Sequence, residues 1–172
     1  MKYYKYADEY SELDGGTTYV ETKSGYVIRQ ITVNGDRFHA SNVSYPRWGL
    51  MLAEGHVEWD EIDDVTPVSK GDFDAVWNAH LERRATIWEN GKAAHPRGTR
   101  IQGFVEIFYP QGVLVNLGDG VLGVANWEEC RASTNSENMS SHRKITGTVI
   151  GYDETNQWLI LGSPQVHDER LT

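Results

Sequence analysis

One short segment divides the chain into two halves with different sequence patterns. This division limits the folds that the chain can adopt. Residues Gly91–Gly98 read GKAAHPRG, so small residues, a proline and two glycines stand between different apolar patterns. Before this segment the chain combines strand patterns with one helix pattern, and after it the chain shows strand patterns alone. A length of 172 residues suffices for two small hydrophobic cores. We therefore predict two domains, residues 1–94 and residues 95–172.

The first half predicts an antiparallel sheet with one long helix. Between residues 3 and 68 much of the chain alternates apolar and polar residues, and Asn34–Gly35 is typical of a two-residue hairpin turn. From Ser69 apolar residues recur three and four positions apart, and Ser69 with Asp72 has the spacing of a capping box. We expect a helix over about residues 69–89, ending near Asn90–Gly91. Its apolar stripe, which must be buried against the sheet, consists of Phe73, Val76, Trp77 and Leu81.

The second half predicts five short strands. Arg100–Tyr109, Gly112–Leu117 and Val121–Ala125 read as strands, with a turn at Gly118–Gly120 between the last two. A polar loop follows, and the chain then predicts a hairpin that turns at Asp153–Asn156. The fold class expected for the whole chain is therefore α+β and mostly β.

Glycines and apolar residues recur through this half in a fixed order. They are Gly103-x-Val105, Gly112-Val113-x-Val115, Gly118-Asp119-Gly120, Leu122-Gly123, Gly147-x-Val149 with Asp153, and Leu159-x-Leu161. Over about 65 residues, Gly98 to Ser163, this order resembles an S1-like OB-fold domain. The resemblance implies a five-stranded OB-type β-barrel whose second and third strands face RNA.

The aromatic rings that such a domain stacks on RNA bases are missing here. The family has Phe-Gly-x-Phe-Val at its second strand, whereas this chain has Gln111-Gly112-Val113-Leu114-Val115. Stacking on an aromatic side chain contributes about 1–3 kcal/mol per base. We therefore expect the barrel to be kept and the usual RNA surface to be lost.

RNA binding through a modified barrel surface is the alternative function. Phe104 and Phe108 have the same parity and are predicted to share one face of their strand, with Tyr109 on the other. The competing interpretation gives the two phenylalanines a core role and leaves the basic residues as a solvated rim. The residues of the alternative nucleic-acid site are Phe104, Phe108, Tyr109, Trp127, Arg131, Arg143 and Lys144.

The first half carries its own set of motifs. They are Tyr4-x-Tyr6, Gly25-x-x-x-Arg29-Gln30-Ile31, Leu52-x-Glu54-Gly55, the acidic run Glu58–Asp64, and Val68-Ser69-x-x-x-Phe73-x-x-x-Trp77. Over residues 3–81 they resemble an uncharacterised family of small bacterial domains that is common near toxin and secretion loci. The resemblance implies association with bacterial conflict systems, and it supplies no catalytic residue.

The chain contains no recognisable catalytic or metal-binding pattern. Its six histidines are scattered without an i,i+4 pair, and a single cysteine cannot form a thiolate zinc site. That cysteine, Cys130, follows Glu128 and Glu129, whose charges disfavour a reactive thiolate. No phosphate-binding glycine loop and no nucleophile elbow occurs. We expect a protein that is not an enzyme and that holds no cofactor and no metal.

Charge and hydropathy limit the partners. The formal net charge is −9, with ten Lys and Arg against sixteen Asp and Glu in residues 1–94, and six against nine in residues 95–172. Because phosphate neutralisation supplies most non-specific affinity for nucleic acids, a chain acidic in both halves binds them poorly. No apolar run is long enough to cross a membrane, and the N-terminus lacks the pattern of a secretory signal. We expect a cytoplasmic protein with no membrane partner.

The acidic run Glu58–Asp64 is the most concentrated charge in the chain. Like charges so close repel one another, so the run is either a solvated loop or a docking surface for a basic protein. In the second interpretation Trp59 supplies an aromatic anchor. The candidate partner-binding residues are Glu58, Trp59, Asp60, Glu61, Asp63 and Asp64.

These observations favour an interaction protein. The leading hypothesis is a cytoplasmic immunity-type inhibitor that binds a basic bacterial toxin, for example a nuclease, and RNA binding through the barrel is the alternative. A scaffold of another role stays open, and the sequence does not set the oligomeric state.

Overall fold

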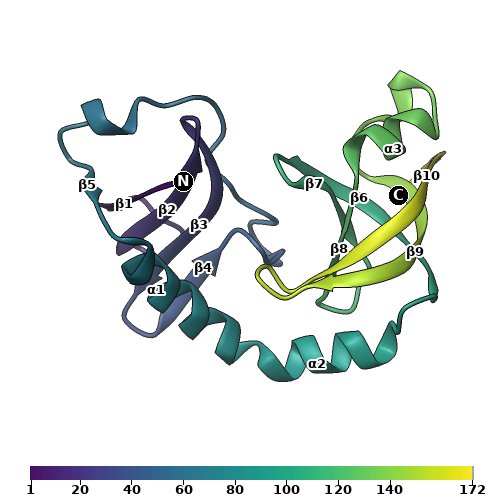
Figure 1. Cartoon of the computed structure of the whole chain (residues 1–172), viewed down its shortest axis with the longest axis horizontal. Helices are drawn as coiled ribbons and strands as arrows, with labels where there is room; N and C mark the ends of the chain where they lie inside the picture. The colour runs from purple at the N-terminus through teal and green to yellow at the C-terminus, as the bar shows by residue number, and fades with distance from the viewer. Residues whose placement is uncertain (172) are drawn as a thin grey trace. The chain divides into compact units, whose positions relative to one another are not determined.

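The computed structural model describes residues 1–171 and has a mixed α+β architecture with two sheets of five strands each (Figure 1). The chain divides into two compact units, the first ending at Arg83 and the second beginning at Arg84. The predicted boundary after residue 94 lies further along the chain than this division. The difference arises because the helix α2 (Ala85–Ala94) packs within the second unit.

The first unit contains an antiparallel sheet. Its strands are β1 (Lys2–Ala7), β2 (Thr17–Lys23), β3 (Tyr26–Asn34), β4 (Arg37–Ala40) and β5 (Thr66–Pro67), in the order β4-β3-β2-β1-β5. The β3–β4 hairpin turns at Gly35, where φ is 63°, and this confirms the prediction made from Asn34–Gly35. A second tight turn, at Ser24–Gly25, joins β2 to β3.

The two faces of this sheet are covered by different kinds of structure. Residues paired across strands share a face, so each row of pairs can be assigned to one side. On one face α1 (Lys70–Arg83) lies over the strands (Figure 1), and its Phe73 and Trp77 are buried against Ile31. The predicted stripe is confirmed, since Val76 and Leu81 pack on the same cluster. On the other face, irregular chain between β4 and β5 places Trp59 on Tyr4 and Val20.

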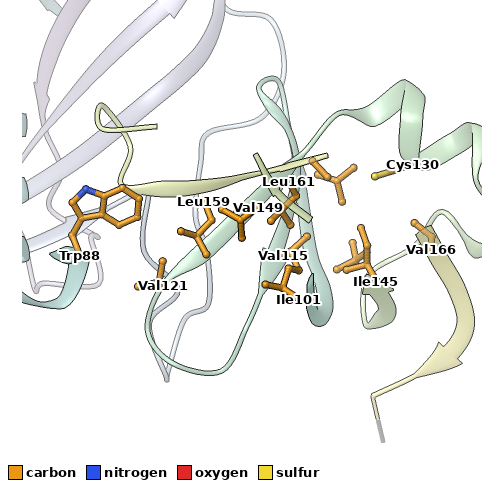
Figure 2. Packing of buried hydrophobic residues seen from close by; sticks show 13 residues of the cluster. Trp88, Ile101, Val115, Val121, Cys130, Ile145, Val149, Leu159, Leu161 and Val166 are labelled. Atoms are coloured by element: carbon orange, nitrogen blue, oxygen red, sulfur yellow. The ribbon is translucent and has the colours of Figure 1, made fainter. Parts of the chain in front are cut away.

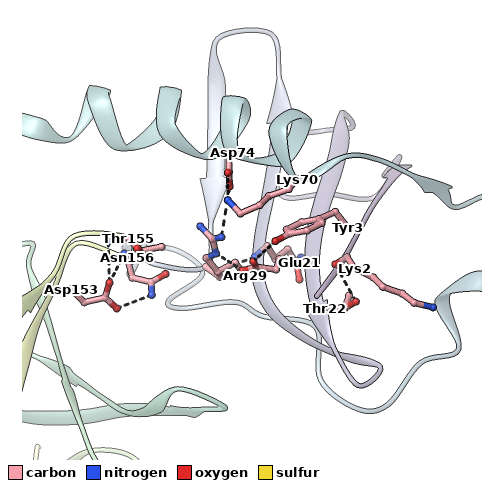
Figure 3. A network of polar contacts seen from close by, with 12 residues as sticks. Lys2, Tyr3, Glu21, Thr22, Arg29, Lys70, Asp74, Asp153, Thr155 and Asn156 are labelled. Carbon is pink, nitrogen blue, oxygen red and sulfur yellow. Dashed lines mark hydrogen bonds and ion pairs between the residues drawn. The ribbon is translucent and has the colours of Figure 1, made fainter.

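A buried ion pair joins the helical face of the sheet to α1. The Arg29 guanidinium donates to Glu21, Tyr3 Oη donates to Glu21 at 3.0 Å, and Asp74 of α1 lies 4.0 Å from Arg29 (Figure 3). The Arg29 side chain is 10% exposed, and its guanidinium lies 4.9 Å from the ring centre of Phe73. The charge is thus compensated on one side by Glu21 and on the other by aromatic faces.

The helix pattern forms two helices, and the prediction of one long helix ending near residue 89 is wrong. At the start, Asp72 N donates to Ser69 Oγ and Ser69 N donates to Asp72 Oδ2, which confirms the capping box. The helix is interrupted at Arg84, with φ −99° and ψ 2°, and α2 then continues to Ala94. Arg84 Nη2 donates to Gly120 O at 3.0 Å, so the residue at the break is bonded within the second unit.

The strands of the second unit are β6 (Arg100–Tyr109), β7 (Gly112–Asn116), β8 (Leu122–Ala125), β9 (Arg143–Asp153) and β10 (Trp158–Arg170). They close into a barrel in the order β10-β8-β7-β6-β9. β8 and β10 are parallel neighbours, and the other pairs are antiparallel. A short helix, α3 (Trp127–Ala132), follows β8.

The barrel core is aliphatic and is covered at both ends by a helix. Val115, Val149 and Leu159 belong to the central cluster, and Figure 2 shows Trp88 of α2 at one end of it and Cys130 of α3 at the other. Burial of these residues supplies most of the free energy that stabilises such a core.

Contacts made by Trp88, Gly91 and Lys92 hold α2 against the barrel. Trp88 Nε1 donates to Glu154 Oε2 at 2.6 Å, Lys92 Nζ lies 3.0 Å from Glu154 Oε1, and Gly91 packs against Val121. A Cβ built on Gly91 would lie 2.4 Å from Val121 Cγ2, so only glycine allows this close approach. Gly91 therefore has a packing role in the helix, and the prediction that it ends the helix is wrong.

Candidate interaction surface

The acidic run is fixed to the turn between β2 and β3. Trp59 begins a short 3-10 helix, η1 (Trp59–Glu61), and its Nε1 donates to Gly25 O at 3.0 Å. The backbone nitrogen of Val57 donates to the same carbonyl at 3.2 Å. The indole ring stacks on Tyr4 and Tyr6, with centroid distances of 5.7 and 6.3 Å. The run therefore has a defined position on the sheet.

Trp59 itself belongs to the core of the first unit. The residue is 8% exposed, its ring packs on Tyr4 and Tyr6, and its nitrogen is hydrogen-bonded within this unit. Trp59 is therefore packed inside this unit and is not presented at its surface. The burial has a clear physical reason, because irregular chain between β4 and β5 covers the sheet face opposite α1, and the indole packs there on Tyr4 and Val20.

The carboxylates of the run differ in how they are neutralised. Asp60 accepts a hydrogen bond from Lys2 and another, at 2.8 Å, from Tyr4 Oη. Both bonds lower the pKa of Asp60, and the bond from Lys2 has the larger effect. Glu58 lies 3.6 Å from His56 Nε2. Glu61, Asp63 and Asp64 are exposed and have no ion-pair partner among residues 1–171. The free charge of the run thus lies in its second half.

A surface cavity of about 440 Å³ opens beside the first half of the run. Gly25 forms part of its wall, and Cβ at that position would collide with the His56 ring. Its other lining residues are Met1, Lys2, Tyr4, Thr22, Ser24, His56, Val57, Glu58, Trp59 and Asp60.

A second acidic segment joins β1 to β2 and was missed at the level of sequence. Residues 8–16 read DEYSELDGG, with four carboxylates and no basic residue. At its tip Tyr10 is 94% exposed. The signal was present in the sequence as an aromatic residue within an uninterrupted acidic loop, but sequence alone does not show which aromatic residues stay exposed.

On the barrel, a β-bulge changes which aromatic residues face outward. The pairing of β6 with β7 shifts register between Val105 and Ile107, and one extra residue reverses the inward and outward sides beyond that point. Phe108 therefore packs against the core, while Phe104 lines a surface cavity of about 290 Å³. The prediction that these two share a face is wrong. Tyr109 is buried as well, with its ring 6.3 Å from that of Trp158.

The remaining residues of the alternative site do not form one cluster of free charge. Arg143 donates to Ser140 Oγ and to Asp168 O, and Lys144 forms an ion pair with Glu169 at 2.8 Å. Trp127 is 38% exposed, and the Arg131 guanidinium lies 5.4 Å from its ring centre. One exposed aromatic–cation pair is thus left on α3.

The described residues form no cluster of metal ligands, and the single cysteine is not an activated nucleophile. Among residues 1–171 no group of three or more His, Cys, Asp or Glu side chains has the geometry to hold a metal ion. Cys130 is fully buried. This burial, together with a smaller effect of the Glu129 charge, raises the pKa of its thiol to about 12. No helix in that range is long and apolar enough to span a membrane.

Comparison with known protein families, with curated protein sequences and with solved structures gives no match to this chain.

Proposed function

We propose that this chain is a non-catalytic interaction protein: a cytoplasmic immunity-type inhibitor that binds and neutralises a basic bacterial toxin. One observation carries the proposal. Glu61, Asp63 and Asp64 stay exposed and unpaired within residues 1–171, on a segment fixed to the sheet by the buried Trp59. Repulsion among these carboxylates costs stability, and a cationic partner would relieve it.

A fixed acidic segment suits a basic partner for two physical reasons. Clustered charge steers an oppositely charged protein and raises its association rate. A segment that is already ordered also loses little conformational entropy on binding. A nuclease is the toxin class that fits best, because enzymes that bind nucleic acid carry basic surfaces, which an acidic inhibitor can occupy.

We further infer that the barrel is of the OB type. The support lies in its order, since the third strand, β8, neighbours the fifth, β10, and the first strand, β6, neighbours the fourth, β9. This non-sequential order is of the Greek-key kind found in OB-folds. In this proposal the barrel acts as a scaffold.

RNA binding is the alternative function, and the exposed pair Trp127 and Arg131 is the observation that favours it. Phe108 packing into the core and the net negative charge oppose it. We expect single-stranded RNA to bind no more tightly than the roughly 10⁻⁴–10⁻⁶ M of non-specific contacts at physiological salt. Anisotropy with a labelled oligonucleotide measures this, and submicromolar binding that is lost in Trp127→Ala would favour RNA.

The decisive experiment for the leading function is recovery of the partner. The tagged chain is isolated from its native cell at about 0.15 M salt, and bound proteins are identified by mass spectrometry. We expect a basic protein whose toxic activity is blocked when the purified chain is added back. Recovery of RNA, or of a protein whose activity is unaffected, would contradict the proposal.

A charge-reversal pair locates the surface. Asp63→Lys with Asp64→Lys should slow association with the recovered partner about tenfold or more at low salt. Glu128→Lys with Glu137→Lys changes the net charge equally but lies in the second unit, so it serves as the matched control. Equal slowing in both variants would show that only the total charge matters.

A further inference from the structure

The loop between β1 and β2 presents one aromatic side chain almost completely to solvent. Tyr10 is 94% exposed, and among residues 1–171 no hydrogen bond or ring contact engages its side chain. A tyrosine ring is large and mostly apolar, so leaving it in water forgoes the free energy that its burial would supply. An isolated exposed aromatic residue is common, but this one also has a fixed support.

That support is a set of bonds that hold the loop at both sides of Tyr10. Asp8 N donates to Gly16 O at 2.9 Å, which closes the loop at its base. Leu13 is buried, and its carbonyl oxygen accepts from Asn34 Nδ2 at 3.0 Å and from the Arg37 guanidinium. The exposed ring is therefore carried by an ordered loop with a buried attachment point.

Two further bonds place this loop on the same sheet face as the acidic run. Cross-strand pairing joins Tyr6, Thr18, Thr32 and His39 in one row, so all four lie on one face. Tyr6 of this row stacks with Trp59 of the run. Thr18 Oγ1 donates to Asp8 at 3.1 Å, and Glu12 Oε2 lies 3.1 Å from His39 Nδ1. Both acidic segments thus cover the face opposite α1.

The charge of this face selects the class of partner. The loop supplies Asp8, Glu9, Glu12 and Asp14, in addition to the five carboxylates of Glu58–Asp64. A second copy of this chain would bring the same negative charges to the contact and would be repelled. A basic protein is the partner whose charge complements this face.

We propose that Tyr10 is the aromatic anchor of this acidic face and inserts into an apolar pocket with a Lys- or Arg-rich rim on a basic protein. The inference rests on the proposed function and deepens it, because it names the anchor that Trp59 does not provide. Tyrosine is enriched at binding hot spots, since its rigid ring buries a large area and loses little entropy. The carboxylates around it set the orientation and the association rate.

The test uses the full chain in its native cell with a photoreactive phenylalanine analogue at one position at a time. The positions are Tyr10, Ile62 in the acidic run, and Ile150, an exposed apolar residue of β9 that serves as the control. We expect light to link position 10 to a protein with an isoelectric point above about 9, and position 150 to give no such product.

The recovered protein is then used to measure dissociation. Tyr10→Ala should raise the dissociation rate at least about tenfold, as a hot spot does, whereas Tyr10→Phe and Ile150→Ala should leave it within about twofold. Because Tyr10 is so exposed, its replacement should leave the thermal midpoint of the chain unchanged, and this excludes a folding defect as the cause.

The outcomes separate the two proposals. A basic protein linked at position 62 but not at position 10, with an unchanged dissociation rate in Tyr10→Ala, would overturn the anchor and leave the proposed function standing. A product at position 10 that contains a second copy of this chain would also overturn the anchor. If neither position 10 nor position 62 links to a basic protein, both proposals are wrong.

Discussion

The two units cover their β-sheets in different ways. The barrel closes on itself and carries a helix at each end, and its core contains mainly aliphatic residues such as Val115 and Leu159. The open sheet of the first unit has two faces and two edges to cover. It uses a helix with a buried ion pair on one face and irregular chain on the other.

This difference determines where surface chemistry can accumulate. Irregular segments must keep their backbone hydrated or bonded, and they carry polar residues more readily than strands do. In the first unit they carry the two acidic segments, each with one buried attachment point, Trp59 or Leu13. In the barrel, by contrast, Phe108 packs against the core and Leu114 is fully buried.

The largest effect is expected when the buried ion pair of the first unit is broken. Arg29→Met leaves Glu21 buried without its partner, and the free energy of unfolding should fall by about 3–5 kcal/mol in a urea titration. Adding Glu21→Leu should recover most of this loss, because the uncompensated charge is then removed. A double variant as unstable as the single one would contradict the assignment of the pair.

Replacement of Trp59 should lower the stability of the first unit. It should weaken binding of the partner only through this loss of stability. Trp59→Ala removes an indole that is 8% exposed, so the first unit should lose about 3 kcal/mol of stability. Chemical denaturation of this variant and of Tyr10→Ala gives the comparison, with a loss below about 0.5 kcal/mol expected for the exposed tyrosine. Similar losses in both variants would remove the distinction between attachment point and anchor.

Two glycine replacements compare the helices of the two units. Gly91→Ala should destabilise the second unit by about 1–3 kcal/mol, because the new Cβ meets Val121 at 2.4 Å. Gly71→Ala in α1 meets only Ser69 Oγ at 3.6 Å, so it should be neutral or stabilise by up to about 1 kcal/mol. Thermal unfolding of both variants decides this, and equal effects would show that α2 is not closely packed on the barrel.

The smallest effect concerns the pH dependence of α2. Burial raises the pKa of Glu154, but the hydrogen bonds from Trp88 and Lys92 outweigh it and lower the pKa. A carboxyl with a lowered folded-state pKa stabilises the fold above its unfolded pKa, and this contribution is lost as the pH falls through the folded value. Glu154→Gln should therefore cost about 1 kcal/mol or less at pH 7 and less still in acid, measured by urea titration at the two pH values.

Local signals in the sequence predicted several elements correctly. The capping box at Ser69 and Asp72, the hairpin turn at Gly35 and the strand Arg100–Tyr109 depend on residues close together in the chain. The acidic run was also found, since five carboxylates within seven residues are visible without a structure. The sequence did not show which aromatic residue is exposed, because whether Trp59 or Tyr10 stays in water depends on the packing around each of them.

The sequence by itself thus determined the strand-rich α+β class, the hairpin turn at Gly35 and the acidic run Glu58–Asp64. Tertiary structure decided the rest. The interruption at Arg84, the close approach of Gly91 to Val121 and the bulge that turns Phe108 inward all depend on partners distant in the chain. Periodicity reports only which side chains share a side of an element, and packing decides which side is buried.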